Sequence, residues 1–271
     1  MQLRAFLVAA ALAAGAQEVK SQPPVLLTES ATTLGKGVMH LGVGFEYLTK
    51  TVSSGDDIPS SLFRVLAGSV RHGVAENVNF DLLWRGGLFA GFENGKRFFD
   101  WGDLSIWTTI NFFPEKDRFP AIAIRTGIKL PNTRFTPSKL GNNQTDYHSQ
   151  ILVSRWYGTT EIRTAVGFSI VGDPYTAASQ DDLYSLQLAA VIGVGEGDRM
   201  FAELYGRTGY HDHDDKLVSR IGYTGFSSFV NWSVFGQVRL AGSNRDFASA
   251  FDCSETWSVG MFLHKELHIE L

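Results

Sequence analysis

The chain has 271 residues, of which 44% are hydrophobic and 13% aromatic, and its formal net charge is −4 at pH 7. This charge gives no sign of nucleic-acid binding, so no nucleic-acid partner is expected. After residue 16 no segment approaches the ~20 consecutive apolar residues that a spanning helix needs, which excludes a helical membrane protein. The single cysteine, Cys253, excludes an intramolecular disulfide scaffold.

The first residues have the three parts of a secretory signal. Residues 1–4 form a short positive end, residues 5–14 are an apolar stretch, and Ala14-Gly15-Ala16 is a small-x-small cleavage site. The alternative is an ordinary buried N-terminal helix. We therefore expect a signal peptide over 1–16, a leader over 17–33 and one domain over 34–271. The leader is also a candidate for a partial plug.

The mature chain is built from segments in which bulky apolar residues alternate with charged or small ones. In 122–130, even positions are Ile, Thr or Leu, and odd positions are Ala, Arg, Gly or Lys. Alternation with a period of two predicts strands with one apolar and one polar face. In chain order, the predicted strands are 36–50, 61–73, 77–91, 102–113, 119–130, 146–157, 160–172, 182–195, 198–211, 216–225, 228–241 and 255–267.

The connections between these strands alternate in length. Short ones lie near 73–77, 114–118, 158–159, 195–197 and 227, and longer polar ones near 51–60, 92–101, 131–145, 173–181, 212–215 and 242–254. Outer-membrane barrels have short periplasmic turns and longer external loops. We therefore predict an all-β fold, a closed antiparallel transmembrane β-barrel of about 12 strands. The alternative is an exported soluble β-sandwich, in which the apolar faces form a core.

Charged residues on the polar faces are the candidates for the lumen lining: Glu46, Arg64, Asp81, Arg85, Asp103, Arg125, Lys129, Glu161, Arg163, Glu203, Arg207 and Arg239. Their alternative role is structural, as a paired network that fills the barrel. Barrels of eight strands are filled by side chains and those of 16–18 hold channels, so a narrow pore and an occluded lumen both fit. Seven cations against five anions predict weak anion preference at most, and passage of largely uncharged solutes.

Neither catalysis nor metal binding has a supporting motif. There is no Gly-x-Ser-x-Gly sequence, and His148-Ser149 stands without a supporting pattern, so we expect no enzyme and no cofactor. His211, His213 and Asp215 are metal-ligand residue types, but they share one short loop with unconstrained spacing. A solvated external loop explains them better than weak contact with a divalent ion or with lipopolysaccharide.

Five short motifs, in order, resemble a known family. They are Thr33-Leu34-Gly35-Lys36-Gly37, the turn 71–77, Gly102-Asp103-Leu104, Gly127-Ile128-Lys129-Leu130-Pro131 and Ala202-Glu203-Leu204-Tyr205-Gly206. Together they are similar to the transporter-like outer-membrane barrels labelled "putative MetA-pathway of phenol degradation", over about residues 32–263. The resemblance implies an outer-membrane location and passage of small aromatic or apolar compounds. The chain departs from such barrels in running on past Leu263 without a terminal aromatic residue.

These observations give two functional hypotheses. The first is a passive channel for small, largely uncharged compounds, including aromatic ones, in the outer membrane of a Gram-negative-type bacterium. The second is a non-conducting surface barrel whose external loops bind a partner or lipid. The expected partners are outer-membrane lipid and lipopolysaccharide, the barrel-assembly machinery and a small-molecule solute.

Overall fold

The computed structural model describes residues 26–49, 59–92, 94–134, 140–141, 143–172, 180–195, 197–210, 214–227, 229–242 and 256–269. The signal peptide, the first part of the leader, His211, His213 and Cys253 lie outside these ranges. No helix long and apolar enough to cross a membrane occurs in them.

The described residues form fourteen strands, with bounds close to the predicted ones. They are β1 Val38–Thr49, β2 Pro59–Ala75, β3 Val78–Trp84, β4 Gly87–Phe92, β5 Arg97–Trp101, β6 Leu104–Phe113, β7 Ala121–Leu130, β8 Asp146–Tyr157, β9 Thr160–Gly172, β10 Gln180–Gly193, β11 Arg199–Thr208, β12 Lys216–Gly225, β13 Asn231–Gly242 and β14 Trp257–His268.

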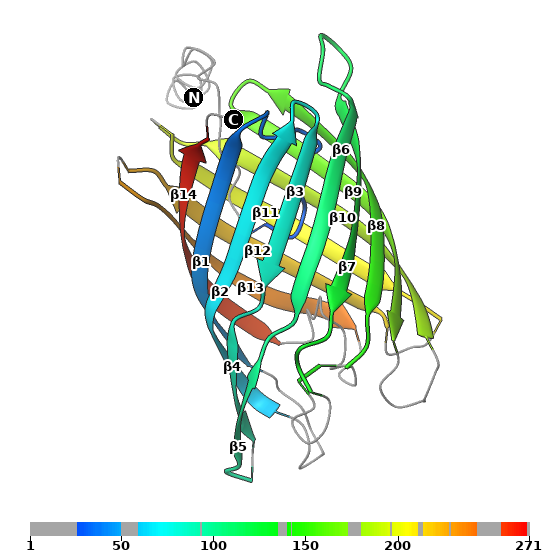
Figure 1. Ribbon diagram of the computed structural model, residues 1–271, viewed down its shortest axis with the longest axis vertical. Coiled ribbons are helices and arrows are strands. Elements are labelled where there is room, and N and C mark those ends of the chain that lie inside the picture. The colour runs from blue at the N-terminus through cyan, green and yellow to red at the C-terminus, as the bar shows by residue number, and fades with distance from the viewer. Residues whose placement is uncertain are drawn as a thin grey trace, which may run out of the picture.

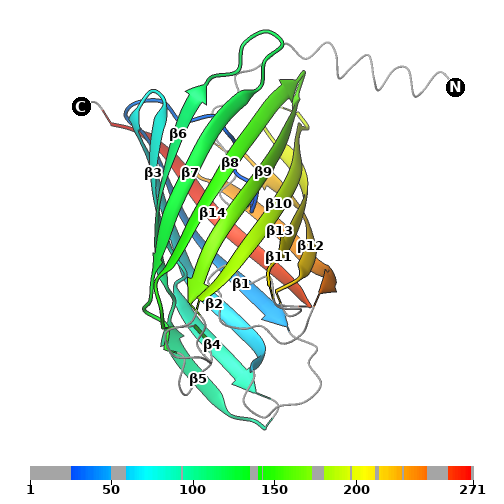
Figure 2. The ribbon, with the colours of Figure 1, turned by 90° about the vertical axis from the view of Figure 1, so that its right-hand side faces the viewer.

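All strand pairs are antiparallel, and the sheet closes on itself. β1 pairs with β2 on one side and with β14 on the other, so the first and last strands seal the wall. β3 and β4 both pair with β2 and are two parts of one wall strand. β5 and β6 form the next wall strand, in which β5 pairs with β4 and β6 pairs with β3. The result is the predicted closed barrel of twelve strands, visible in two orthogonal views (Figures 1 and 2).

The prediction of a loop over 92–101 was partly wrong, because residues 97–101 form β5. This strand pairs with β4, and the hairpin of the two extends past the rest of the wall (Figure 1). Two aromatic pairs join the two strands: the ring centroids of Phe89 and Phe99 are 4.8 Å apart and those of Phe92 and Phe98 are 5.3 Å apart. Cross-strand aromatic pairs stabilise a sheet, which explains why a segment rich in polar residues at its tip still continues as strands.

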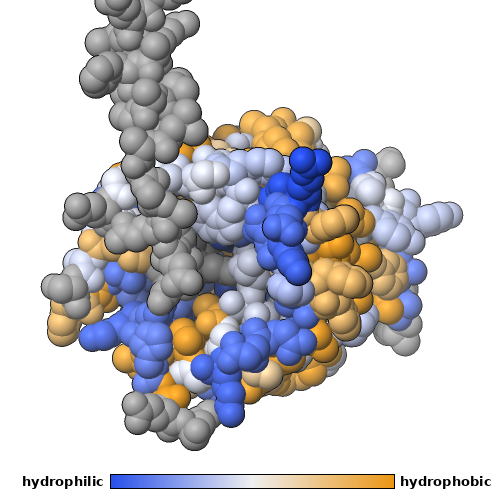
Figure 3. Space-filling view, turned by 90° about the horizontal axis from the view of Figure 1, so that it is seen from above, coloured by the Kyte–Doolittle hydropathy of each residue, from blue (hydrophilic) through white to orange (hydrophobic). Residues whose placement is uncertain are grey.

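The wall is apolar outside and polar inside. Outward side chains such as Val166, Leu186 and Ile221 are 58%, 62% and 63% exposed, whereas the inward charged residues Asp81 and Lys129 are fully buried. Figure 3 shows hydrophobic residues along much of the outer wall and hydrophilic ones at the rim. Apolar side chains facing outward and charges facing inward suit a barrel whose surroundings are lipid.

The two ends of the barrel differ. Val38 of β1 and His268 of β14 lie at the end that carries the short turns, at the top of Figure 1. We call this the turn end and the opposite one the loop end. In outer-membrane barrels short turns face the periplasm, which orients this chain.

Candidate functional site: a plugged lumen with a cavity

Residues 26–34, here called the plug, precede β1 and run inside the lumen (Figure 1). The main-chain N–H groups of Leu27 and Thr28 donate to the Glu203 carboxylate on β11, each at 2.9 Å. The Thr28 carbonyl oxygen accepts from the Arg163 guanidinium on β9 at 3.3 Å. Because buried backbone groups need partners and this segment has no neighbouring strand, these wall side chains hold it in place.

The next residues of the plug are bound by strands close to the turn end. The hydroxyl of Ser30 donates to Glu161 on β9 at 2.5 Å. The N–H of Ala31 donates to the Ser154 hydroxyl on β8 at 3.2 Å, and its carbonyl oxygen accepts from Asn111 on β6 at 2.6 Å. The plug therefore takes hydrogen bonds from several sides of the barrel.

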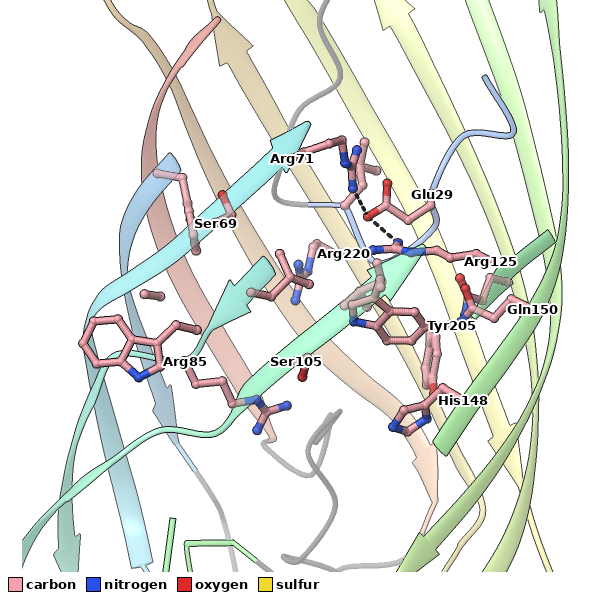
Figure 4. Close-up of a pocket in the computed structure, with 18 of the residues that line it drawn as sticks. Glu29, Ser69, Arg71, Arg85, Ser105, Arg125, His148, Gln150, Tyr205 and Arg220 are labelled. Carbon is pink, nitrogen blue, oxygen red and sulfur yellow. Dashed lines mark hydrogen bonds and ion pairs between the residues drawn. The ribbon is translucent and has the colours of Figure 1, made fainter. Parts of the chain in front are cut away.

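Glu29 closes a ring of four charges with two arginines and an aspartate, and Figure 4 shows its contacts with the two arginines. Its carboxylate contacts Arg71 of β2 and Arg125 of β7, both at 2.6 Å. The same two guanidiniums bind Asp81 of β3, both at 2.8 Å. The ring is electrically neutral and connects the plug to three strands of the wall.

The ring sets the charge state of Glu29. Burial by itself would raise the pKa of this carboxyl, but the charges of Arg125 and Arg71 and their hydrogen bonds outweigh it and lower the pKa to about 2. Glu29 is therefore ionised throughout the range in which cells live.

Apolar contacts complete the packing of the plug. Leu26 lies in a cluster with Val191, Phe201 and Phe235. Ala31 is fully buried against small wall residues, in a cluster formed by Ala121, Ala123, Leu152 and Ala165. The alanines at these inward positions leave room for a segment of chain, which larger side chains would fill.

Between the plug and the loop end lies a cavity of about 260 Å³. Leu26, Leu27 and Glu29 of the plug form part of its lining. Wall residues of several kinds also line it, among them the aromatic Trp107, Tyr205, Phe235 and Phe262, the polar Ser105, Gln150, Ser169, Ser185 and Gln187, and six arginines. The arginines are Arg64, Arg71, Arg85, Arg125, Arg207 and Arg220, and the carboxylates of the described lining are Glu29 and Glu46.

A local irregularity of the wall directs Arg85 into the cavity. Arg85 and Gly86 lie between β3 and β4, opposite Leu66 of β2, which has a φ of 54°. The inward positions are odd-numbered in β3 and even-numbered in β4, as expected at a β-bulge that re-aims a side chain. Gly102 passes so close to Arg85 that an added Cβ would lie 2.4 Å from the Arg85 Cβ. A side chain at residue 102 would therefore displace Arg85.

The twelve predicted lumen residues all lie on wall strands or beside them, with their side chains in three kinds of place. Those that line the cavity are Glu46, Arg64, Arg85, Arg125 and Arg207. Those that are buried in bonds around it are Asp81, Asp103, Lys129, Glu161, Arg163 and Glu203. Arg239 of β13 is half-buried outside the described cavity lining.

The predicted residues form separate groups along the lumen. Near the loop end, Lys129 contacts Asp146 at 2.8 Å and Asp103 at 3.7 Å, and Arg64 forms an ion pair with Glu46. Near the plug, Arg163 binds Glu161 at 2.7 Å. The wall strands thus place oppositely charged residues beside one another at both ends of the lumen.

Sequence reasoning missed several residues of this site. Glu29 sits in a leader without alternation, so nothing indicated that it faces arginines. Arg71 was assigned to a turn motif, and Arg220 lies in 216–225, where the two faces are hard to tell apart. One signal was available for Arg71. It lies two residues after Ser69 in the same strand, so both side chains point to the same face, and Ser69 also lines the cavity.

The metal candidate gains no support from the described residues. Asp215 is exposed, and the Thr208 hydroxyl donates to its carboxylate at 2.6 Å. Within the described ranges no group of three or more His, Cys, Asp or Glu side chains could hold a metal ion.

No protein-family profile and no curated protein matches this sequence. The resemblance to the phenol-degradation family thus stays a prediction. Among solved structures, the chain is similar to the COG4313 outer membrane channel from Pseudomonas putida F1, with a TM-score of 0.66 and 13% identity over 91% of this chain and 100% of that one. It also matches LpxR from Salmonella typhimurium (TM-score 0.47, 10% identity, 83% and 99%) and OmpT of Vibrio cholerae (0.40, 8%, 85% and 99%).

At these identities the likeness shows the fold. Together with the closed wall and its apolar exterior, it identifies the chain as an outer-membrane β-barrel of a Gram-negative-type bacterium.

The prediction that the chain is not an enzyme was wrong, because it was deduced from the lack of a local catalytic motif. One fold hosts many unrelated activities, so the barrel gives no ground for excluding catalysis. The motif argument also fails physically, because a barrel brings side chains together across strands. His148 Nδ1 lies 2.8 Å from the hydroxyl of Ser169 on the next strand, a pair that no local motif encodes.

Proposed function

We propose that this protein is a passive outer-membrane channel for small solutes and that the plug limits its open width. The observation that carries the proposal is the cavity inside a closed barrel, lined by charged and aromatic side chains and bounded on one side by the plug. The printed description of the Pseudomonas putida structure as a channel supports the same function. The resemblance to the phenol-degradation family makes small aromatic compounds the first solutes to test.

Reconstitution into planar bilayers and liposomes tests the proposal. We expect discrete, low conductance, and swelling of the liposomes in small solutes but not in oligosaccharides. Liposomes with heat-denatured protein are the control. Protein that is fully inserted, as judged by its heat-dependent gel mobility, and that passes none of the small solutes would overturn the channel.

In cells, uptake of phenol, a sugar and an inorganic anion should be compared in competition, with and without the protein. Preference for the phenolic compound would support the family resemblance. Strong preference for the sugar or the anion would contradict it.

The β4–β5 hairpin favours a second candidate, a surface-binding role. It extends past the wall (Figure 2), and Phe89, Phe99 and Trp101 on it are 49%, 43% and 50% exposed. Exposed aromatic patches commonly mark interaction sites. The double substitution Phe89→Ser and Phe99→Ser tests this: lost binding to lipopolysaccharide vesicles with unchanged conductance would assign the hairpin a separate role.

A further inference from the structure

The charged and the neutral polar side chains of the cavity differ in how they are bonded. Arg71 and Arg125, for example, are held by the two carboxylates of the charge ring. By contrast, the side chains of Gln150, Ser185 and Gln187 line the cavity and make no hydrogen bond to another residue of the described ranges. The open hydrogen-bonding capacity of this lining is therefore found on neutral groups.

These three side chains lie together on one part of the wall. Ser185 of β10 and Gln150 of β8 are both directly opposite Gly167 of β9, one on each side of it. A Cβ added to Gly167 would lie 2.4 Å from the Ser185 Oγ and 3.1 Å from the Gln150 Cγ, so both side chains lean over this glycine. Gln187 follows Ser185 by two residues and therefore faces the same side of β10. We call Gln150, Ser185 and Gln187 the polar niche, and Figure 4 shows Gln150 pointing into the cavity.

The polar niche needs hydrogen-bond donors from a ligand. Gln187 is 1% exposed, and its Oε1 is buried with no partner within the part of the chain that the structure describes. A buried polar atom of this kind is destabilising unless a ligand or water contacts it. The amide oxygens of Gln150 and Gln187 each accept a hydrogen bond, and one hydroxyl has a single proton to donate. A ligand that satisfies both amides through hydroxyls therefore carries two of them.

Apolar side chains bound the polar niche on both sides along β10. Leu183, two residues before Ser185, is 4% exposed and lines the cavity. On the other side, Ala189 follows Gln187 and packs in one cluster with Leu26 of the plug, which also lines the cavity. The polar band is thus only two residues long, about 7 Å, which suits two neighbouring hydroxyls on an otherwise apolar body.

The size of the cavity limits that body. Its volume of about 260 Å³ exceeds the roughly 150 Å³ that holds benzene in an engineered cavity, so a molecule of one ring with two substituents fits.

From these observations we propose that the polar niche is a binding site for a small neutral cyclic diol. The hydroxyls contact Gln150, Ser185 and Gln187, and the apolar edge of the ring lies against Leu183 and Leu26. The inference rests on the proposed channel function, since it names the class of solute that the channel holds. It narrows the sequence-based expectation of small, largely uncharged solutes to those with two neighbouring hydroxyls.

Binding to the purified, detergent-folded protein tests the site independently of transport, by titration calorimetry with empty micelles as the blank. The probes cis-cyclohexane-1,2-diol, cyclohexanol and cyclohexanecarboxamide share one ring and offer two hydroxyls, one hydroxyl and one amide. We expect the diol to bind at least about tenfold more tightly than the other two, because only the diol has a donor for each glutamine on two separate carbon atoms. Equal affinity for the diol and cyclohexanol, or tighter binding of the carboxamide, would overturn the proposal, whatever the variants do.

Substitutions then locate the site. Gln150→Leu and Gln187→Leu should each weaken diol binding about tenfold, because each removes one hydrogen bond and keeps a side chain of similar size. Gly167→Ala should weaken it as well, since the added methyl group displaces the Ser185 hydroxyl. Gln180→Leu is the matched control, because it makes the same change at an exposed position of β10 outside the described cavity lining.

Heat-dependent gel mobility shows whether each variant barrel is folded. Unchanged diol affinity in the folded Gln150→Leu and Gln187→Leu variants, or an equal loss in Gln180→Leu, would contradict the assignment.

Conductance separates the two proposals. Diol binding without any conductance would leave the site standing and remove the channel. Conductance through a protein that binds the diol no better than cyclohexanol would leave the channel standing and remove the site.

Discussion

The lumen near the turn end and the lumen near the loop end contrast in how they are filled, although one alternating pattern builds both. Near the turn end, the plug occupies the lumen, its polar groups bonded to Glu203, Glu161 and Asn111. Toward the loop end the wall carries aromatic and arginine side chains and leaves a cavity of about 260 Å³. The difference shows that the alternating pattern of the wall strands specifies which residues face the lumen. Whether the lumen is filled or leaves a cavity depends on the plug, which is not part of the wall.

Removing the plug should have the largest effect on conductance, because the lumen near the turn end would then be open like the lumen toward the loop end. A chain lacking residues 26–34 is expected to show a several-fold higher single-channel conductance, since water then fills the part of the lumen that the plug occupies. Replacing the same residues with a Gly/Ser segment of equal length is the control for chain length, and it should open the channel as well. If both variants conduct like the wild-type protein, the plug does not limit flow.

Enlarging one inward residue in each region tests the contrast between packed and hollow. Ala123 is 1% exposed and shares a cluster with Ala31, so Ala123→Leu should cost about 1–3 kcal/mol of stability or displace the plug. Ser185 lines the cavity opposite Gly167 in the neighbouring strand, so Ser185→Leu should be tolerated. Heat stability of the gel-shifted barrel is the measurement, and equal stability of the two variants would show that both regions are equally full.

A smaller change weakens the ring without altering its shape. Glu29→Gln removes the charge that Arg71 and Arg125 bind and keeps a side chain of similar size. Charge-assisted hydrogen bonds are the stronger kind, so we expect the docked plug to lose about 1–2 kcal/mol and a larger-conductance state to become more frequent. Glu115→Gln is the control, because the Glu115 carboxylate accepts from the Trp156 N–H at the turn end, away from the ring.

The smallest expected effect is the response of the wild-type protein to mild acid. Glu29 has a pKa of about 2 in the folded chain against an ordinary 4.5. Because the pKa of Glu29 is lowered in the folded chain, its ionised carboxylate stabilises the docked plug fully when the pH is above the ordinary pKa. This stabilisation is lost as the pH falls toward 2. Conductance should therefore stay constant from pH 7 to about 5 and rise only below about 4. Opening near pH 6 would instead point to a histidine in the lumen, and Glu29→Gln should remove the acid response altogether.

The wall could be read from the sequence because its physical cause is local. Strands 146–157, 160–172 and 216–225 have the predicted bounds, and the closed barrel is the predicted one. Period-two alternation reports directly on the two environments of a wall strand, lipid and lumen. The β4–β5 hairpin was harder, because its stability comes from aromatic pairs across two strands.

The plug and the other contents of the lumen were harder still to predict from the sequence. The leader has no period, and its partners are side chains that only closure of the barrel brings together, so the bonds of Glu29 and Glu203 have no signature in either segment. Which of the charged residues line the cavity was hidden for the same reason. Counting inward charges along the chain includes pairs such as Lys129 and Asp146, which neutralise each other away from the cavity.

The bond from Leu27 to Glu203 joins residues 176 positions apart in the chain, and this separation has a consequence for the order of folding. Bringing together such distant groups costs chain entropy that nearby contacts must first offset. The anchors of the plug are distributed from β2 to β11, so the plug gains its full set of bonds only when most of the wall is in place. Docking of the plug is then a late step of assembly, and a newly inserted barrel passes through a leaky intermediate before the plug seals it.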